Sequence, residues 1–179
     1  MYQNNALQIN PLSAPEAAGQ EVLQDASPLF NLLSELHLSE FESQHLLRQI
    51  SERDRTIAAF LKSQNKRIDL LSQVVALTVL GQIGEPQPVI LSEGGIDFQH
   101  PTPIATGAHL SVKLVLMPQA LGLLLRARVT HCDRKGEGYD VGTEFEYLSD
   151  AQRQLLARYI LQRQAQERRL AREQNESGI

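Results

Sequence analysis

The stretch that decides the fold is Val89-Ile90-Leu91-Ser92-Glu93-Gly94-Gly95-Ile96-Asp97-Phe98. An apolar run breaks at a serine and two glycines, and it resumes as an alternation of apolar and polar residues. Glycine adopts backbone conformations that other residues avoid and lets a ligand approach the main chain, while a serine hydroxyl both donates and accepts hydrogen bonds. The pattern predicts a tight turn between two strands that can hold a polar ligand. A plain connection within an all-β domain is the alternative.

The alternation continues after this turn. Period-two patterning covers residues 110–116, 123–131 and 139–145, as in strands with one buried face. The middle run places on one face Leu123, Leu125, Ala127, Val129 and His131. Ser149 and Gln152 then have the spacing of a capping box that opens a helix. The sequence predicts a small antiparallel barrel or sandwich followed by a helix.

In this order the signals resemble the PilZ domain of bacterial cyclic di-GMP signalling. The matching pieces are LSEGGIDF, a proline pair, GAHLSVKLVL, RARV and YDVGTEFEYLSDAQRQLLARYILQRQ, within residues 77–164. The resemblance implies an α+β fold, with a small antiparallel six-stranded β-barrel and a C-terminal helix. It also implies a regulatory role without enzymatic activity.

The nucleotide-binding residues of that family are only partly present. The family holds the nucleotide through an Arg-x-x-x-Arg arm before the first strand and an Asp/Asn-x-Ser-x-x-Gly turn. Ser92 and Gly95 match the turn, but Ile90 stands at its acidic or amide position, and residues 70–88 contain no Arg or Lys. The resemblance therefore implies a degenerate nucleotide turn at Ser92 and Gly95, with weak or no binding of cyclic di-GMP.

The region before the barrel predicts a tail and long helices. Residues 1–26 are polar and contain Pro and Gly, which predicts a flexible N-terminal tail. Ser27 followed by Pro28 is a helix start, and Ser39 begins a second capping box. No Pro or Gly follows before Thr78, which predicts one helix about 58 Å long. Residues 27–78 are accordingly expected to form a helical oligomerisation region, and 79–179 the barrel with its C-terminal helix.

This long helix carries a heptad-like apolar pattern that is typical of a coiled coil. Leucine at one seam position with isoleucine at the other favours three or four strands over two. The pattern predicts a homo-oligomer, specifically a parallel tetramer; a helix that folds back on its own beginning or on the barrel is the alternative. The seam residues are Leu47, Asp54, Leu61, Ile68 and Val75 at one position, and Ile50, Ile57, Gln64, Leu71 and Thr78 at the other.

Composition narrows the functional classes. The net charge of −4 argues against a nucleic-acid-binding protein, which usually carries a basic face. No apolar stretch reaches the roughly 18 residues of a membrane span, and the first residues do not resemble a signal peptide, so we expect a cytoplasmic protein without membrane insertion. The histidines lack metal-ligand spacing, and no phosphate loop or nucleophile motif is present. No metal, cofactor or catalytic residue is therefore predicted.

Two functions remain open. The first is an adaptor, in which a helical stalk presents several divergent PilZ domains to a protein partner that the sequence does not identify. The second is a cyclic di-GMP receptor with a reduced site, which needs cationic side chains near Ser92 from Arg126, Arg128 or a neighbouring subunit. The two functions differ in whether such a cation reaches the turn.

Overall fold

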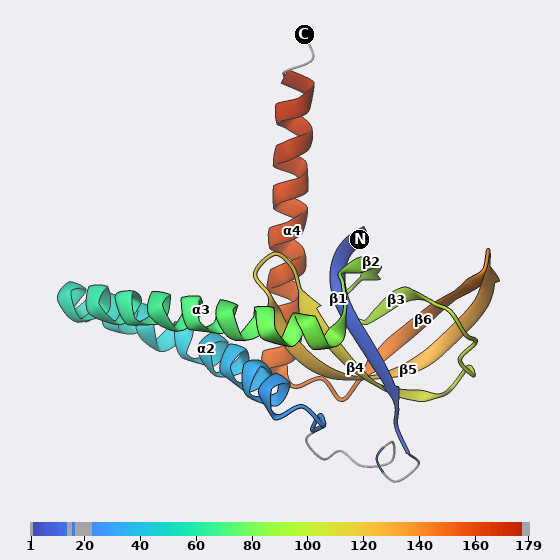
Figure 1. Cartoon of the computed structure of the whole chain (residues 1–179). Helices are drawn as coiled ribbons and strands as arrows, with labels where there is room; N and C mark the ends of the chain where they lie inside the picture. Colours follow the sequence, from blue (N-terminus) through green and yellow to red (C-terminus); the bar gives the residue numbers. More distant parts are fainter. Residues whose placement is uncertain (1, 14–15, 17–22, 177–179) are drawn as a thin grey trace.

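Six antiparallel strands close into a barrel in the computed structural model, which describes residues 2–13, 16 and 23–176 (Figure 1). Around the barrel the order is β1-β2-β3-β6-β5-β4. This confirms the predicted α+β fold with a six-stranded barrel. The strands are β1 (Tyr2–Pro11), β2 (Gln87–Leu91), β3 (Gly95–His100), β4 (His109–Leu116), β5 (Leu121–Lys135) and β6 (Gly138–Glu146).

Strand β1 corrects the predicted N-terminal tail. It lies between β2 and β4, with Asn4 opposite Pro88 and Ala6 opposite Val115. Leu7 and Ile9 pack against the barrel core, and Asn5 is fully buried. The prediction of a flexible tail is therefore wrong for residues 2–11, while residues 14–15 and 17–22 lie outside the described part of the chain. Without β1 the barrel would have open edges at β2 and β4.

The interior of the barrel follows the predicted alternation, with one exception on β5. Leu123, Leu125 and Val129 are buried in the core as expected. A register shift between Val129 and His131 then inserts an extra residue, so that His131 is exposed and Cys132 packs against the core instead. The prediction that His131 shares the inner face is wrong, because a β-bulge reverses the alternation after it.

The expected continuous helix is a hairpin of two helices, α2 (Pro28–Arg53) and α3 (Arg55–Ile83). Ser39 does not begin a new helix, because α2 runs through it without a break. The break occurs at Asp54, whose carboxylate accepts hydrogen bonds from the backbone N–H groups of Thr56 (2.9 Å) and Ile57 (3.0 Å). This is N-cap geometry. Helix α3 returns along α2 toward the barrel (Figure 1), so the prediction of a single 58 Å helix with Asp54 in a seam is wrong.

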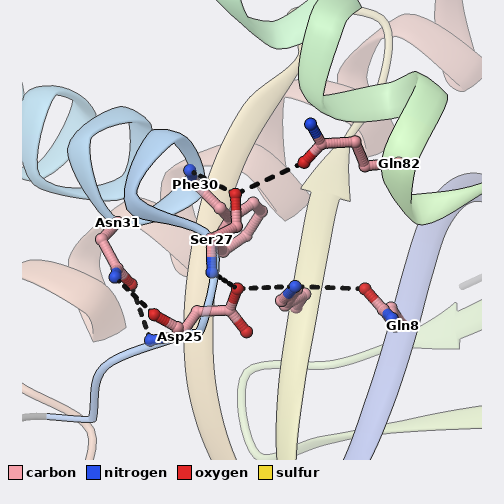
Figure 2. Close-up of polar contacts among 7 residues, drawn as sticks. Gln8, Asp25, Ser27, Phe30, Asn31 and Gln82 are labelled. Carbon is pink, nitrogen blue, oxygen red and sulfur yellow. Dashed lines mark hydrogen bonds and ion pairs between the residues drawn. The ribbon is translucent and has the colours of Figure 1, made fainter.

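A buried polar cluster around Asp25 attaches this hairpin to the barrel (Figure 2). The Asp25 carboxylate lies 2.6 Å from Lys113 Nζ of β4 and accepts a hydrogen bond from the Ser27 N–H at 2.7 Å. Ser27 is the N-cap of α2 as predicted, and its hydroxyl also donates to Gln82 near the end of α3. Since both charged side chains are nearly buried, loss of either one would leave the other unpaired, which is costly. The cluster thus fixes both ends of the hairpin at the barrel.

The last helix, α4 (Asp150–Glu176), begins with the predicted capping box. The Ser149 hydroxyl accepts from the Gln152 backbone N–H (3.1 Å), and the side-chain oxygen Oε1 of Gln152 accepts from the Ser149 backbone N–H (3.0 Å). Leu156 and Tyr159 are buried against the barrel, whereas nearly every described side chain from Leu161 onward is exposed. The second half of α4 therefore projects away from the barrel (Figure 1). No helix in the described residues is long and apolar enough to cross a membrane.

Candidate functional site

The turn between β2 and β3 is closed by hydrogen bonds between Ser92 and Gly95. The Ser92 hydroxyl accepts from the Gly95 N–H at 3.1 Å and donates to the Gly95 carbonyl at 3.2 Å, and the Ser92 N–H donates to the same carbonyl at 3.0 Å. The hydroxyl therefore already uses its donor and one acceptor site within the turn. The predicted site residues Ser92 and Gly95 are brought together, and each supports the bend between the strands.

The outer surface next to this turn is shared by β2, β3, β6 and β5. One row across these strands consists of Ile90, Asp97, Gly142 and His131, paired in that order. The His131 ring lies directly over Gly142, where a Cβ atom would come within 1.8 Å of the ring. Ile90 is half-buried and carries no hydrogen-bonding group. This row therefore offers Asp97 and His131 as its polar side chains, and none of its members is a permanent cation.

A second row places one arginine in line with the turn. Gly95 pairs with Glu144, and Glu144 pairs with Arg128, so Arg128 lies two strands from Gly95, or about 10 Å away. Its guanidinium contacts the carboxylates of Glu144 (3.3 Å) and Glu146 (3.6 Å). The positive charge of Arg128 is thus balanced by two negative charges before any ligand binds.

Arg126, the other candidate cation, is directed elsewhere. Its side chain is largely buried, and its guanidinium donates a hydrogen bond to the backbone carbonyl of Glu16. In the segment where an arginine arm is expected, α3 extends to Ile83. Gly84 then caps the helix with a φ of +112°, a backbone conformation that favours glycine. The structure therefore brings neither Arg126 nor an arm to the turn.

The hairpin presents an apolar surface that no described element covers. On α3, the face opposite the packed side carries five large apolar residues, more than half exposed, which we call the α3 stripe. Its members are Phe60 (62%), Leu70 (55%), Leu71 (67%), Val74 (62%) and Leu77 (67%). Small side chains occupy the packed side, among them Ala58, Ser72 and Ala76. On α3 these five large apolar residues therefore lie on the outer face.

A PilZ domain matches residues 61–162, more than half of the chain. The chain belongs to the PilZ family. The match covers most of α3, five of the six strands and part of α4, but it omits β1 and α2. The strand that closes this PilZ barrel and the first half of its hairpin therefore lie outside the family match.

One of the solved structures to which the chain is similar covers nearly its whole length. No curated protein matches the sequence. The chain is similar to a pathogenic protein from Xanthomonas campestris, described as a tetrameric PilZ domain self-assembled via an unusual helical bundle. Identity is 15% and the TM-score 0.56, over 96% of this chain and 89% of that one. The PilZ fold is therefore shared over nearly the whole chain, helical extension included.

Two further structures are similar over less than half of the chain. The Bacillus subtilis inhibitor of motility MotI/DgrA has 20% identity and a TM-score of 0.38, over 45% of this chain and 42% of that one. The apo state of MrkH from K. pneumonia has 17% identity and a TM-score of 0.39, over 48% and 44%.

The predicted oligomerisation residues separate into three groups in the hairpin. Asp54 caps α3, as described above. Leu47, Ile50, Leu61, Gln64 and Val75 are half-buried, whereas Ile57, Ile68, Leu71 and Thr78 are exposed. The same heptad pattern contains residues that pack within the hairpin and residues on its outer surface. The sequence alone could therefore not distinguish these two groups. The α3 stripe shares only Leu71 with the predicted seam.

A cavity of about 380 Å³ lies where the hairpin meets α4 and the barrel, and its lining includes His37, Glu40, Asp69 and Arg158. Burial raises the pKa of Glu40 to about 7; the charge of Asp69 and a hydrogen bond between the two carboxyl groups add to this, and Arg158 opposes it. Burial lowers the pKa of His37, whose Nδ1 accepts the Gly122 N–H at 3.1 Å. Sequence reasoning missed this cluster, whose members come from three helices. Within the described residues, no group of His, Cys, Asp or Glu could hold a metal ion.

We expect Glu40 to make the stability of the protein dependent on pH. A carboxyl group whose folded-state pKa is raised from 4.5 to about 7 binds its proton more tightly in the folded than in the unfolded state. Its contribution to the free energy of unfolding therefore falls as pH rises through this window. Glu40→Gln removes the effect, so this variant should gain melting temperature relative to the original protein between pH 5 and pH 8.

The contribution of His37 to the free energy of unfolding changes with pH in the opposite direction over part of this range. The reason is that the unfolded state takes up a proton that the buried ring resists. For this reason the informative quantity is the difference in melting temperature between Glu40→Gln and the original protein, measured at several pH values. Glu42→Gln, a change at an exposed position of the same helix, is the control. Parallel curves for Glu40→Gln and the original protein would contradict the expectation.

Proposed function

We propose that this PilZ protein is a non-enzymatic regulatory adaptor of bacterial cyclic di-GMP signalling. It self-associates through its helical hairpin, acts in the cytoplasm through protein partners, and binds cyclic di-GMP weakly or not at all. The observation that carries the proposal is that the polar groups at the turn already have partners within the protein. The Ser92 hydroxyl is hydrogen-bonded to Gly95, and Arg128 contacts the carboxylates of Glu144 and Glu146. A ligand with two phosphate charges requires free guanidinium groups.

The proposed assembly is a tetramer. The Xanthomonas campestris protein, which shares the fold over 96% of this chain, assembles as a tetramer through a helical bundle. The α3 stripe is an exposed apolar surface. Exposed apolar surfaces of this kind mark sites of protein association, and a helical bundle would bury it. In this proposal the contact surface is supplied by the hairpin and not by one continuous helix with a heptad seam. Such an assembly would display several PilZ domains to one partner.

The alternative function is a cyclic di-GMP receptor with a reduced or subunit-shared site. It is favoured by the position of Arg128, which is half-exposed and lies in the same row as Gly95. In this case the nucleotide would have to displace Glu144 and Glu146 from the guanidinium, or a second subunit would have to supply its own arginines.

Isothermal titration with cyclic di-GMP distinguishes the two functions. For the adaptor we expect no saturable heat, which corresponds to a dissociation constant above about 1 mM, since each missing charged hydrogen bond costs roughly 1.5–3 kcal/mol. Micromolar binding that is lost in Ser92→Ala or in Arg128→Gln, and retained in the control Arg169→Gln on α4, would establish the receptor instead.

A further inference from the structure

A second cavity, of about 450 Å³, lies at the end of the barrel where β1 begins. It is lined by Gln3, Asn4, Pro88, Met117, Pro118 and Arg163. None of these residues belongs to the Ser92–Gly95 turn or to the rows of side chains beside it. The first residues of β1 and the middle of α4 come close to each other here (Figure 1). The cavity is therefore formed by elements far apart in sequence.

Hydrogen bonds fix the orientation of the Gln3 side chain. The Met117 N–H donates to Asn5 Oδ1 at 2.9 Å. The Tyr159 hydroxyl donates to the Met117 carbonyl at 2.6 Å and lies 3.2 Å from the same Asn5 oxygen. The Asn5 amide nitrogen then donates to Gln3 Oε1 at 3.3 Å. Gln3 consequently directs its oxygen toward Asn5, and reversing the amide would place two donors against each other. Its Nε2 group is left without an acceptor among the described residues, although Gln3 is only 5% exposed.

Arg163 presents a second donor without an acceptor. Its Nη1 donates to Gln166 at 2.9 Å, one turn further along α4, while its Nε is buried and has no partner in the described part of the chain. Burial raises the pKa of Tyr159, and the charge of Arg163 acts against that shift. A buried donor without an acceptor costs free energy, and here two of them belong to side chains that line one cavity.

We propose that this cavity binds an oxyanion, a phosphate or a carboxylate group, through the guanidinium of Arg163 and the side-chain amide of Gln3. The two donors and the permanent positive charge of arginine match the acceptor oxygens of such a group. The residues that line the cavity include no carboxylate that would repel it. The volume exceeds the roughly 30 Å³ of one water molecule, so the cavity has room for a larger group. The charge of Glu167 raises the pKa of Tyr159, but Glu167 does not line the cavity.

The test is thermal unfolding of the full chain with increasing sodium phosphate, sodium acetate or a short acidic peptide, at constant ionic strength. A ligand that binds only the folded state raises the melting temperature saturably. We expect such a rise with at least one of the three, at millimolar concentration or below, and its loss in Arg163→Gln. Arg169→Gln, which removes an exposed arginine of the same helix paired with Glu173, should keep it.

Gln3→Glu provides a second variant. It keeps an acceptor for Asn5 but replaces the free donor by an acceptor that can face Arg163, so the ligand-dependent rise should vanish even if the variant itself is more stable. A rise with phosphate or acetate identifies a free ion as the ligand, whereas a rise with the peptide alone identifies a carboxylate of a protein partner. No saturable rise with any of the three, or an equal rise in Arg163→Gln, would overturn the proposal. The outcome does not depend on nucleotide binding or on self-association.

Discussion

Gly95→Ala is expected to destabilise the barrel strongly, whereas Gly94→Ala, one residue earlier in the same turn, is expected to keep the stability of the original protein. A Cβ atom on Gly95 would lie 1.9 Å from the backbone carbonyl oxygen of Thr143, while one on Gly94 meets nothing within 4 Å. The clash involves the backbone of the paired strand β6, which cannot move aside as a flexible side chain can. We expect a cost of about 3 kcal/mol, the upper end of the usual range for overpacking. This is a large part of the about 5–15 kcal/mol that stabilises a typical domain.

Urea unfolding followed by circular dichroism measures this difference, with Gly94→Ala as the matched control. If Gly95→Ala unfolded at the same urea concentration as the original protein, β3 and β6 would have to lie further apart than the structure places them. The pair of variants also separates two explanations for the glycine. A glycine needed only for a ligand would leave the stability of the free protein unchanged, while a glycine needed for strand packing would not.

The sequence predicted the elements whose signals are local. Alternating apolar residues located the strands after residue 87, and the caps at Ser27 and Ser149 located two helix starts, because a cap is formed by residues within one turn. It missed β1, in which Gln3 and Asn5 occupy buried positions that usually hold apolar residues. Their burial depends on hydrogen bonds to Met117 and Tyr159, which are distant in sequence.

Two other predictions were wrong because a local change of backbone conformation interrupts a regular apolar pattern. Asp54 interrupted an apolar pattern without Pro or Gly, and only its hydrogen bonds to Thr56 and Ile57 show that it caps a new helix. The bulge before His131 is likewise invisible in a period-two pattern. At the candidate site, the sequence predicted the turn that Ser92 and Gly95 form. The pairing of Arg128 with Glu144 and Glu146 could not be predicted, because it joins neighbouring strands.

The α3 stripe gives the prediction with the largest effect on assembly. If the protein self-associates through the stripe as proposed, Leu71→Asp combined with Val74→Asp should produce a monomer, because two carboxylates would be buried without partners in any interface that covers the stripe. The same change at Leu61 would be harder to interpret, since Leu61 is half-buried within the hairpin. Leu71 and Val74 are 67% and 62% exposed, so the folded monomer itself should lose little stability.

Light scattering coupled to size exclusion, at micromolar protein concentration, measures the mass of each assembly. Gln49→Asp, which adds a carboxylate at an exposed polar position of α2, controls for charge alone and should leave the assembly intact. Circular dichroism of the double variant should show unchanged helix content, because the N-cap at Asp54 and the cluster at Asp25 are untouched. A monomeric original protein, or a double variant of unchanged mass, would show that the stripe is not the surface through which copies of this chain associate. Loss of assembly with the fold retained would instead assign to the outward face of α3 the oligomerisation role that was predicted for a continuous seam.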